Sequence, residues 1–194
     1  MNNKKEIIIP SVPQLEAELK REKYKTRYWA TFRSTIYVLV IVAAIAVLVA
    51  TLWLPVLQIY GSSMTPTLEE GEIVISLKSQ DYEHGDIVAF YYNNKILIKR
   101  VIACPGEWVD IKADGTVYVN GERKEESYIS EKALGDCDID LPYQVPESRI
   151  FVMGDHRSVS VDSRNSSVGC IAEEQIVGKM VFRVWPLEKI GIIQ

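Results

Sequence analysis

The chain begins its main hydrophobic pattern with one long uncharged run. Ile36 to Leu54 contains no charged residue, and at a rise of roughly 1.5 Å per residue about 20 apolar residues cross the ~30 Å hydrocarbon core of a bilayer. Trp29 and Trp53 flank the run, as aromatic side chains do at the two membrane interfaces. Pro55 predicts the end of the helix. We therefore expect a transmembrane helix over residues 34–56.

The charges on the two sides of this run differ in sign. Eight basic and four acidic side chains precede it, whereas the first charges after it are Glu69 and Glu70. Because cytoplasmic flanks carry the excess of Lys and Arg, we expect residues 1–33 to be cytoplasmic and residues 57–194 extracytoplasmic, in a single-pass protein of the cell membrane. A cleaved signal peptide is the alternative. Its apolar core is typically about 7–15 residues and ends at a small-x-small site, but here Ala44–Ala46 lies in mid-run.

The segment before the run is basic and contains good helix formers. Pro10 and Pro13 precede Leu15–Lys20, which predicts a short helix. We interpret the segment as a basic collar against anionic lipid headgroups, with a partner-binding role as the alternative. Its basic residues are Lys4, Lys5, Lys20, Arg21, Lys23, Lys25, Arg27 and Arg33.

After Tyr60 the pattern changes to short apolar runs separated by turn signals. Such runs are typical of β-strands, and Asn93-Asn94, Asp114-Gly115 and Asn120-Gly121 are typical of hairpin turns. We predict a mostly β protein, in which the transmembrane helix is followed by one antiparallel β domain of roughly 135 residues. Lys124–Ser148 lacks strand signals and is predicted to be a surface excursion. The predicted strands are 73–75, 87–91, 96–102, 109–111, 117–119 and 177–184.

Charge and cysteine content exclude several classes of function. The formal net charge is −4 for the whole chain, so the net of +4 before the membrane run leaves −8 after it. An acidic outer domain argues against nucleic acid as a partner. Cys104, Cys137 and Cys170 are an odd set without a Cys-x-x-Cys pair, so we expect no zinc site. We interpret them as buried unpaired thiols, with one disulfide plus one free thiol as the alternative.

A candidate nucleophile follows the membrane run. Ser63 lies within Gly61–Leu68, and a serine hydroxyl becomes a good nucleophile only when a base takes its proton. The chain has two histidines, His84 and His156. A lysine whose pKa is lowered by burial is a further candidate base. Taken alone, the segment is equally consistent with a polar turn in which Pro66 fixes φ.

Lys99 is the candidate base. In a strand over 96–102, alternation places Leu97, Lys99 and Val101 on one face, so the amine lies between apolar neighbours. The alternative is an edge-strand lysine whose stem covers apolar surface. A third segment, Met153–Arg164, is dense in hydrogen-bonding groups and predicts a loop that orients an amine. Together the segments favour a Ser/Lys hydrolase held at a membrane surface.

The order of these segments resembles type I signal peptidases, the bacterial leader peptidase family. The similarity extends from the membrane run to Pro186. One span, without a large inserted β-domain, is similar to the compact Gram-positive type. The matching motifs are Gly61–Leu68, Gly85–Val88, Lys99–Ile102 with Pro105-Gly106, and Gly154-Asp155 through Asp162–Arg164.

The resemblance implies a role for each matching residue. Ser63 would attack the scissile carbonyl, and neutral Lys99 would act as the general base on the way to an acyl-enzyme. Ser160 would hold the lysine amine. Asp162 and Arg164 would support that loop as a pair.

The resemblance also implies the substrate and its pockets. The enzyme would remove signal peptides from exported preproteins, as a monomer in contact with membrane lipid and with no metal or other cofactor. Arg100 would be structural. The preference for small side chains before the cut implies shallow apolar pockets, to which we assign Leu57, Ile59 and Ile98.

Two positions depart from the family pattern. His156 replaces the common Asn and raises a Ser/His mechanism, although endoplasmic-reticulum relatives place their histidine where this chain has Lys99. The resemblance implies the backbone N–H of Ser63 as one oxyanion donor. Gly61 replaces the serine with which some Gram-negative relatives supply a second donor, so here that second donor must come from elsewhere or be absent. Two other functions remain as alternatives. One is a soluble Ser/Lys autoprotease of SOS-repressor type, and the membrane run argues against it. The other is a non-catalytic tethered β-domain, and the presence of Ser63 and Lys99 argues against it.

Overall fold

The computed structural model describes residues 11–79 and 81–193, with the backbone alone for residues 50–53. The expectations that concern Lys4, Lys5 and Pro10, and the side chain of Trp53, lie outside the described residues. The chain forms two compact units, Met1–Val49 and Ala50–Gln194. Each unit is described by itself below.

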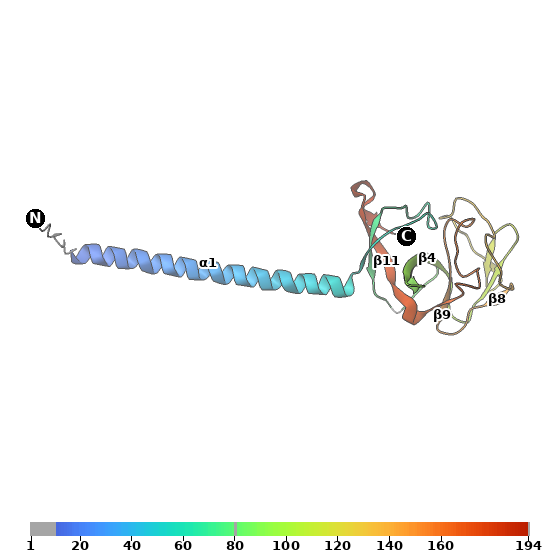
Figure 1. Ribbon diagram of the computed structural model, residues 1–194, viewed down its shortest axis with the longest axis horizontal. Helices are drawn as coiled ribbons and strands as arrows, with labels where there is room; N and C mark the ends of the chain where they lie inside the picture. The colour runs from blue at the N-terminus through green and yellow to red at the C-terminus, as the bar shows by residue number, and fades with distance from the viewer. Residues whose placement is uncertain (1–10, 80, 194) are drawn as a thin grey trace, which may run out of the picture. The chain divides into compact units, whose positions relative to one another are not determined.

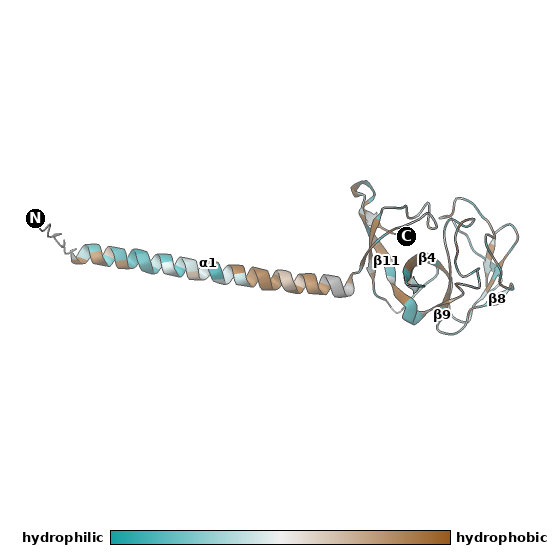
Figure 2. Cartoon of the chain, viewed as in Figure 1, coloured by the Kyte–Doolittle hydropathy of each residue, from teal (hydrophilic) through white to brown (hydrophobic). Residues whose placement is uncertain are grey.

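The described part of the first unit is almost entirely helix α1, Val12–Trp53, whose last four residues, 50–53, belong to the second unit (Figure 1). Figure 2 shows that α1 changes from mainly hydrophilic to mainly hydrophobic residues along its length. Its part Val12–Val49 is long and apolar enough to cross a membrane, by length and composition. The short helix predicted at Leu15–Lys20 and the apolar run are therefore parts of one continuous helix. It ends before Pro55, which has no N–H to donate.

The second unit is built on two antiparallel sheets, so the predicted mostly β fold is confirmed. The larger sheet has the order β1-β2-β11-β3-β4-β9-β10, with β12 paired to β11. Figure 1 labels its strands β11, β4 and β9. Its strands are β1 (Val56–Gln58), β2 (Ile73–Leu77), β3 (Ile87–Tyr92), β4 (Lys95–Ala103), β9 (Arg149–Met153), β10 (Ile171–Ala172), β11 (Ile176–Trp185) and β12 (Gly191–Ile192).

The smaller sheet has the order β7-β6-β5-β8. Two short 3-10 helices, η1 (Glu173–Gln175) and η2 (Leu187–Lys189), flank β11. The strands are β5 (Trp108–Ile111), β6 (Val117–Val119), β7 (Glu122–Arg123) and β8 (Tyr143–Gln144). All six predicted strands are present within two residues of their predicted ends. The segment Lys124–Ser148 contains only the two-residue β8, in line with its lack of strand signals.

The hairpin of β3 and β4 places the candidate base. Asn93 and Asn94 join the two strands with φ of 43° and 63°, the left-handed conformation of a tight hairpin turn. The register pairs Lys99 with Val88. The core beside this hairpin contains Ile59, Met64, Leu68, Val74, Ile87, Ala89 and Met180, with Leu57 and Ile98 packed against it. Lys99 thus lies on an inner strand of the sheet, opposite the buried Val88 of a second core cluster.

Candidate active site

Ser63 and Lys99 are in direct contact. Ser63 lies in the loop between β1 and β2, and Lys99 lies on β4. Lys99 Nζ donates a hydrogen bond of 2.7 Å to Ser63 Oγ. Lys99 is only 3% exposed, so the alternative of a lysine whose head reaches water is wrong. The structure brings together the two side chains that the sequence predicts as nucleophile and base.

The surroundings of Lys99 lower its pKa from 10.5 to about 8. Burial is the largest cause, because removal from water disfavours the charged amine. The carboxylate of Asp162 acts in the opposite direction and raises the pKa, whereas the nearby guanidinium of Arg164 lowers it further. A substantial fraction of Lys99 is therefore neutral in mildly alkaline solution, and the neutral amine is the form that accepts a proton.

Asp162 and Arg164 form a buried ion pair in the loop after β9. Arg164 Nε donates to Asp162 Oδ1 at 2.8 Å, and a second guanidinium nitrogen donates to Asp162 Oδ2, also at 2.8 Å. The backbone N–H of Gly154 donates to the same carboxylate at 2.9 Å. Both side chains of the pair are fully buried. The carboxylate thus joins the two ends of the loop, as the predicted supporting pair requires.

Ser160 does not hold the amine in this structure. Its buried Oγ has no hydrogen-bond partner among the described residues. The hydroxyl faces the Cα of Gly154, since a Cβ built on Gly154 would collide with Ser160 Oγ. The same Cβ would lie 2.5 Å from the carbonyl oxygen of Ser63. The predicted contact of Ser160 with Lys99 is therefore not formed, and the role of Ser160 stays a prediction.

Arg100 pairs with Asp155 behind the candidate dyad. Two guanidinium nitrogens of Arg100 donate to Asp155 at 2.9 and 2.7 Å, and a third donates to the carbonyl oxygen of Gly85 at 2.7 Å. The ring of Tyr128 lies 3.9 Å from the guanidinium carbon, a cation–π contact. Thr67 Oγ1 donates to Asp155 at 2.5 Å. These contacts connect β4 to the Ser63 loop and to the loop after β9.

The excursion Lys124–Ser148 is anchored more firmly than a surface loop. Two guanidinium nitrogens of Arg157 donate to the carboxylate of Glu126 at 3.1 and 2.5 Å, and both side chains are buried. Desolvation raises the pKa of the Tyr128 hydroxyl above its ordinary value. The sequence did not single out Glu126 or Tyr128, because their partners Arg157 and Arg100 are distant in the chain.

His156 contacts the backbone of the Ser63 loop. Its Nδ1 lies 3.1 Å from Thr65 Oγ1 and 3.3 Å from the carbonyl oxygen of Ser62. Its backbone N–H donates to the carbonyl oxygen of Ser63 at 3.1 Å. The hydroxyl of Ser63 instead contacts Lys99. This geometry favours Lys99 over His156 as the base.

An apolar groove of about 520 Å³ opens beside the dyad. It is formed by β1, the start of the Ser63 loop and the first half of β4. The three residues predicted to form substrate pockets, Leu57, Ile59 and Ile98, all line this groove together with Ser63 and Lys99. The cysteines lie elsewhere and are unpaired as predicted, although only Cys170 is buried and Cys104 and Cys137 are half-buried.

Comparison with known proteins identifies the family. The family described as "Signal peptidase, peptidase S26" matches residues 32–185. Signal peptidase IB of Staphylococcus aureus is 40% identical over 151 residues, which cover 68% of this chain and 78% of the relative. Signal peptidase I of Bacillus amyloliquefaciens is 36% identical over 187 residues, covering 90% and 93%. A crystal structure of a signal peptidase I from Enterococcus faecalis is 30% identical and covers 51% of this chain and 96% of that one, with a TM-score of 0.42. On the family match and the Staphylococcus aureus and Bacillus amyloliquefaciens relatives, the chain belongs to the signal peptidase family, peptidase S26, and is a type I signal peptidase.

Proposed function

We propose that this serine protease removes signal peptides from exported preproteins with Ser63 as nucleophile and Lys99 as general base. The observation that carries the proposal is the 2.7 Å contact between the buried Lys99 Nζ and Ser63 Oγ. We also propose that α1 anchors the enzyme in the cell membrane as a monomer. Residues 1–33 are then cytoplasmic, and the bilayer-spanning segment begins at residue 34 and ends with α1 at Trp53 rather than at residue 56, because Val56 begins β1. Residues 57–194, together with Val56, form the extracytoplasmic catalytic domain.

The proposed reaction begins when neutral Lys99 takes the proton of Ser63. Oγ then attacks the scissile carbonyl, and the backbone N–H of Ser63 donates to the oxyanion, a contribution of about 3 kcal/mol per donor in other acyl-transfer enzymes. The Lys99 ammonium returns its proton to the leaving amine as the peptide bond breaks. A water, deprotonated by the same lysine, hydrolyses the ester and releases the signal peptide. Lys99 is therefore the side chain that accepts and returns the proton in both halves of the reaction.

The groove explains how a signal peptide would be held. The segment of β4 from Lys95 to Lys99 pairs with β3 on one side, whereas pairing with β9 begins at Arg100. Its other edge therefore has backbone groups free to pair with an extended peptide. Leu57, Ile59 and Ile98 would contact small side chains before the cut.

Membrane attachment of both reactants raises their effective concentration. A signal peptide is itself anchored in the bilayer, and confinement to one surface turns an encounter in three dimensions into one near a plane. The apolar part of α1 supplies such an anchor to the enzyme. This arrangement increases the rate of encounter without any additional contact.

The test is cleavage of a precursor with an Ala-x-Ala site by the full chain in detergent, with a chelator present. Wild type is compared with Ser63→Ala and Lys99→Ala, and with the exposed-residue controls Ser130→Ala and Lys112→Ala. Cleavage by wild type and both controls, but by neither Ser63→Ala nor Lys99→Ala, supports the dyad. Cleavage that survives Lys99→Ala would mean that another residue is the base, and His156 would be the next candidate. The absence of cleavage by every protein would favour the non-catalytic tethered β-domain.

A further inference from the structure

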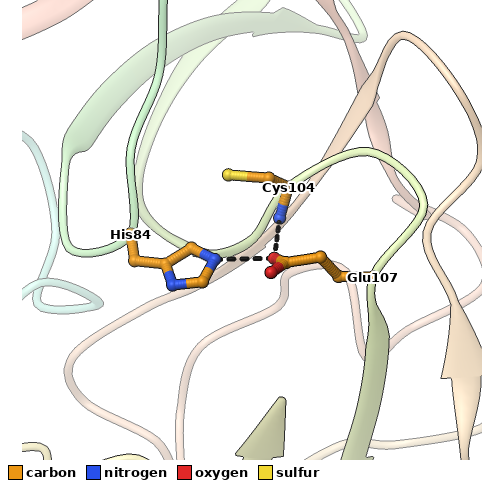
Figure 3. A group of neighbouring side chains, drawn as sticks. All are labelled: His84, Cys104 and Glu107. Atoms are coloured by element: carbon orange, nitrogen blue, oxygen red, sulfur yellow. Dashed lines mark hydrogen bonds and ion pairs between the residues drawn. The ribbon is translucent and has the colours of Figure 1, made fainter. Parts of the chain in front are cut away.

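A second group of reactive side chains lies outside the peptide groove. Among the described residues, His84, Cys104 and Glu107 bring an imidazole Nε2, a thiol and a carboxylate oxygen within 4.8 Å of one another. Figure 3 shows the three side chains converging from two neighbouring loops. Imidazole, thiolate and carboxylate are the protein ligands of zinc. We propose that His84, Cys104 and Glu107 bind one Zn²⁺ ion, contrary to the expectation of no zinc site, which rested on cysteine number and spacing alone.

Two tight turns position these ligands. Cys104 and Glu107 are the first and fourth residues of a turn closed by the bond from Glu107 N–H to the Cys104 carbonyl oxygen, 3.2 Å. Its centre is Pro105-Gly106, with Gly106 at φ +81°, the sequence typical of a type II turn. His84 lies inside a second turn, closed from Asp86 N–H to the Glu83 carbonyl oxygen at 3.1 Å. Backbone conformation therefore fixes the ligand positions before any metal binds.

The carboxylate of Glu107 is oriented by neighbouring donors. Its Oε2 accepts from the backbone N–H of Cys104 at 2.7 Å and lies 2.6 Å from His84 Nε2. Its Oε1 accepts from Asn120 Nδ2 at 3.1 Å. Such outer partners fix the geometry of metal ligands and strengthen metal binding. Asn120 therefore acts as a positioning residue for the site.

The charge around Cys104 also favours a cation. Besides Glu107, the carboxylates of Asp86 and Glu83 lie near enough to Cys104 to act on its thiol electrostatically. Nearby negative charge disfavours a thiolate, but a bound divalent cation neutralises that charge. A thiol that coordinates such a cation loses its proton. Zinc binding would thus release the Cys104 proton to solvent and form one Zn–S bond, with no change of oxidation state.

Zinc binding would require all three ligand atoms to move, since they now lie within 4.8 Å of one another. With Zn–N and Zn–O bonds of about 2.0–2.1 Å, tetrahedral ligands lie roughly 3.3 Å apart. His84 Nε2 and Glu107 Oε2, now 2.6 Å apart, would have to separate by a fraction of an ångström. The His84 side chain is 38% exposed and can make this movement. The fourth ligand position is left to a water molecule.

The site would stabilise the hairpin that carries Lys99. His84 lies three residues before the start of β3 (Ile87–Tyr92), and Cys104 directly follows β4 (Lys95–Ala103). A metal ion bound only in the folded state raises stability with metal concentration. The proposal concerns stability rather than peptide-bond chemistry, and it does not rest on the proposed dyad.

The test is metal titration of the full chain in detergent after removal of bound metal with a chelator. Zn²⁺ stoichiometry and affinity are measured by calorimetry and elemental analysis, and Co²⁺ is used as a spectroscopic substitute. Wild type is compared with Cys104→Ser and His84→Gln, and Cys137→Ser is the matched thiol control. Since His84 is exposed, its substitution tests the site even if Cys104→Ser fails to fold.

We expect one Zn²⁺ per chain, a thiolate-to-cobalt charge-transfer band, and a Tm that rises with Zn²⁺ in wild type and in Cys137→Ser. Cys104→Ser should abolish the charge-transfer band. His84→Gln should weaken Zn²⁺ binding at least about tenfold, the lower end of the loss seen on removing an outer partner. Equal Zn²⁺ affinity in wild type and His84→Gln, or no binding by wild type, would leave only a His–Glu ion pair and overturn the proposal.

Discussion

Gly154 lies directly against the backbone of Ser63. A Cβ built on Gly154 would be 2.5 Å from the Ser63 carbonyl oxygen and would also collide with Ser160 Oγ. The backbone N–H of His156 donates to the same Ser63 carbonyl at 3.1 Å. The loop after β9 therefore fixes the position of the nucleophile through the backbone, and glycine is required at position 154 for space.

Gly154→Ala should reduce cleavage strongly. The added methyl group must displace the Ser63 backbone or the Ser160 side chain, and a displacement of 1 Å costs roughly a hundredfold in rate. Overpacking should also lower stability by about 1–3 kcal/mol. The measurements are kcat/KM and thermal unfolding. Gly191→Ala is the control, since a Cβ there meets nothing within 4 Å, and equal effects of the two substitutions would contradict the packing argument.

Cleavage should increase with pH through the pKa of Lys99, about 8. Below that pKa only the neutral fraction of Lys99 accepts the Ser63 proton, so kcat/KM should fall about tenfold per pH unit. The measurement is a pH profile of kcat/KM on an Ala-x-Ala precursor. A profile flat from acidic to alkaline pH would remove Lys99 as the base.

Turn residues between apolar runs made the β3–β4 hairpin predictable from the sequence. Residues 87–91 and 96–102 were predicted because Asn93-Asn94 interrupts two apolar runs, and the structure places a hairpin there. β9 was not predicted because Ile150–Met153 is apolar at every position and buried throughout. Without alternation, its period does not separate a strand from other buried segments. β3 is equally buried over Ile87–Phe90, so the adjacent Asn93-Asn94 turn, rather than alternation, made that strand predictable.

Local motifs predicted the dyad, whereas partners distant in the chain were missed. Ser63 and Lys99 each lie in a distinctive segment, so they could be paired before the structure was known. The contacts of Arg100 with Tyr128 and of Arg157 with Glu126 join loops that no sequence spacing connects. Ser160 is a different case, since its motif matched but its hydroxyl faces Gly154 and the predicted contact with Lys99 is not formed. Side-chain direction depends on packing that a motif does not encode.

Lys99→Met should abolish cleavage and stabilise the fold at pH 7. Lowering the pKa of Lys99 from 10.5 to about 8 means that the folded state binds the proton less tightly than the unfolded state. At pH 7 this difference in proton binding lowers the free energy of unfolding by about 3 kcal/mol. This cost declines as pH rises from about 8 to 10.5, because the unfolded lysine then also becomes neutral. Removing the amine removes this cost.

Unfolding of wild type and Lys99→Met, followed at pH 7 and at pH 10 by near-ultraviolet circular dichroism in detergent, measures the effect. The advantage of Lys99→Met should be largest at pH 7 and smaller at pH 10. Lys112→Met is the control, because Lys112 is exposed and the carboxylate of Asp110 raises its pKa. A Lys99→Met variant less stable than wild type at pH 7 would show that the lysine is not penalised by burial.

Asp155→Ala should destabilise the fold because it leaves a buried charge unpaired. Arg100 and Asp155 are 2% and 0% exposed, and loss of one partner of a buried ion pair costs about 3–5 kcal/mol. Thr67 and Arg100 would both lose an acceptor, which disconnects β4 from the Ser63 loop. The measurement is the free energy of unfolding of Asp155→Ala, Arg100→Met and the double variant. The double variant should be more stable than the sum of the two single effects predicts, since it leaves neither charge unpaired. Strictly additive losses would mean that Arg100 and Asp155 act independently, despite contacts of 2.9 and 2.7 Å.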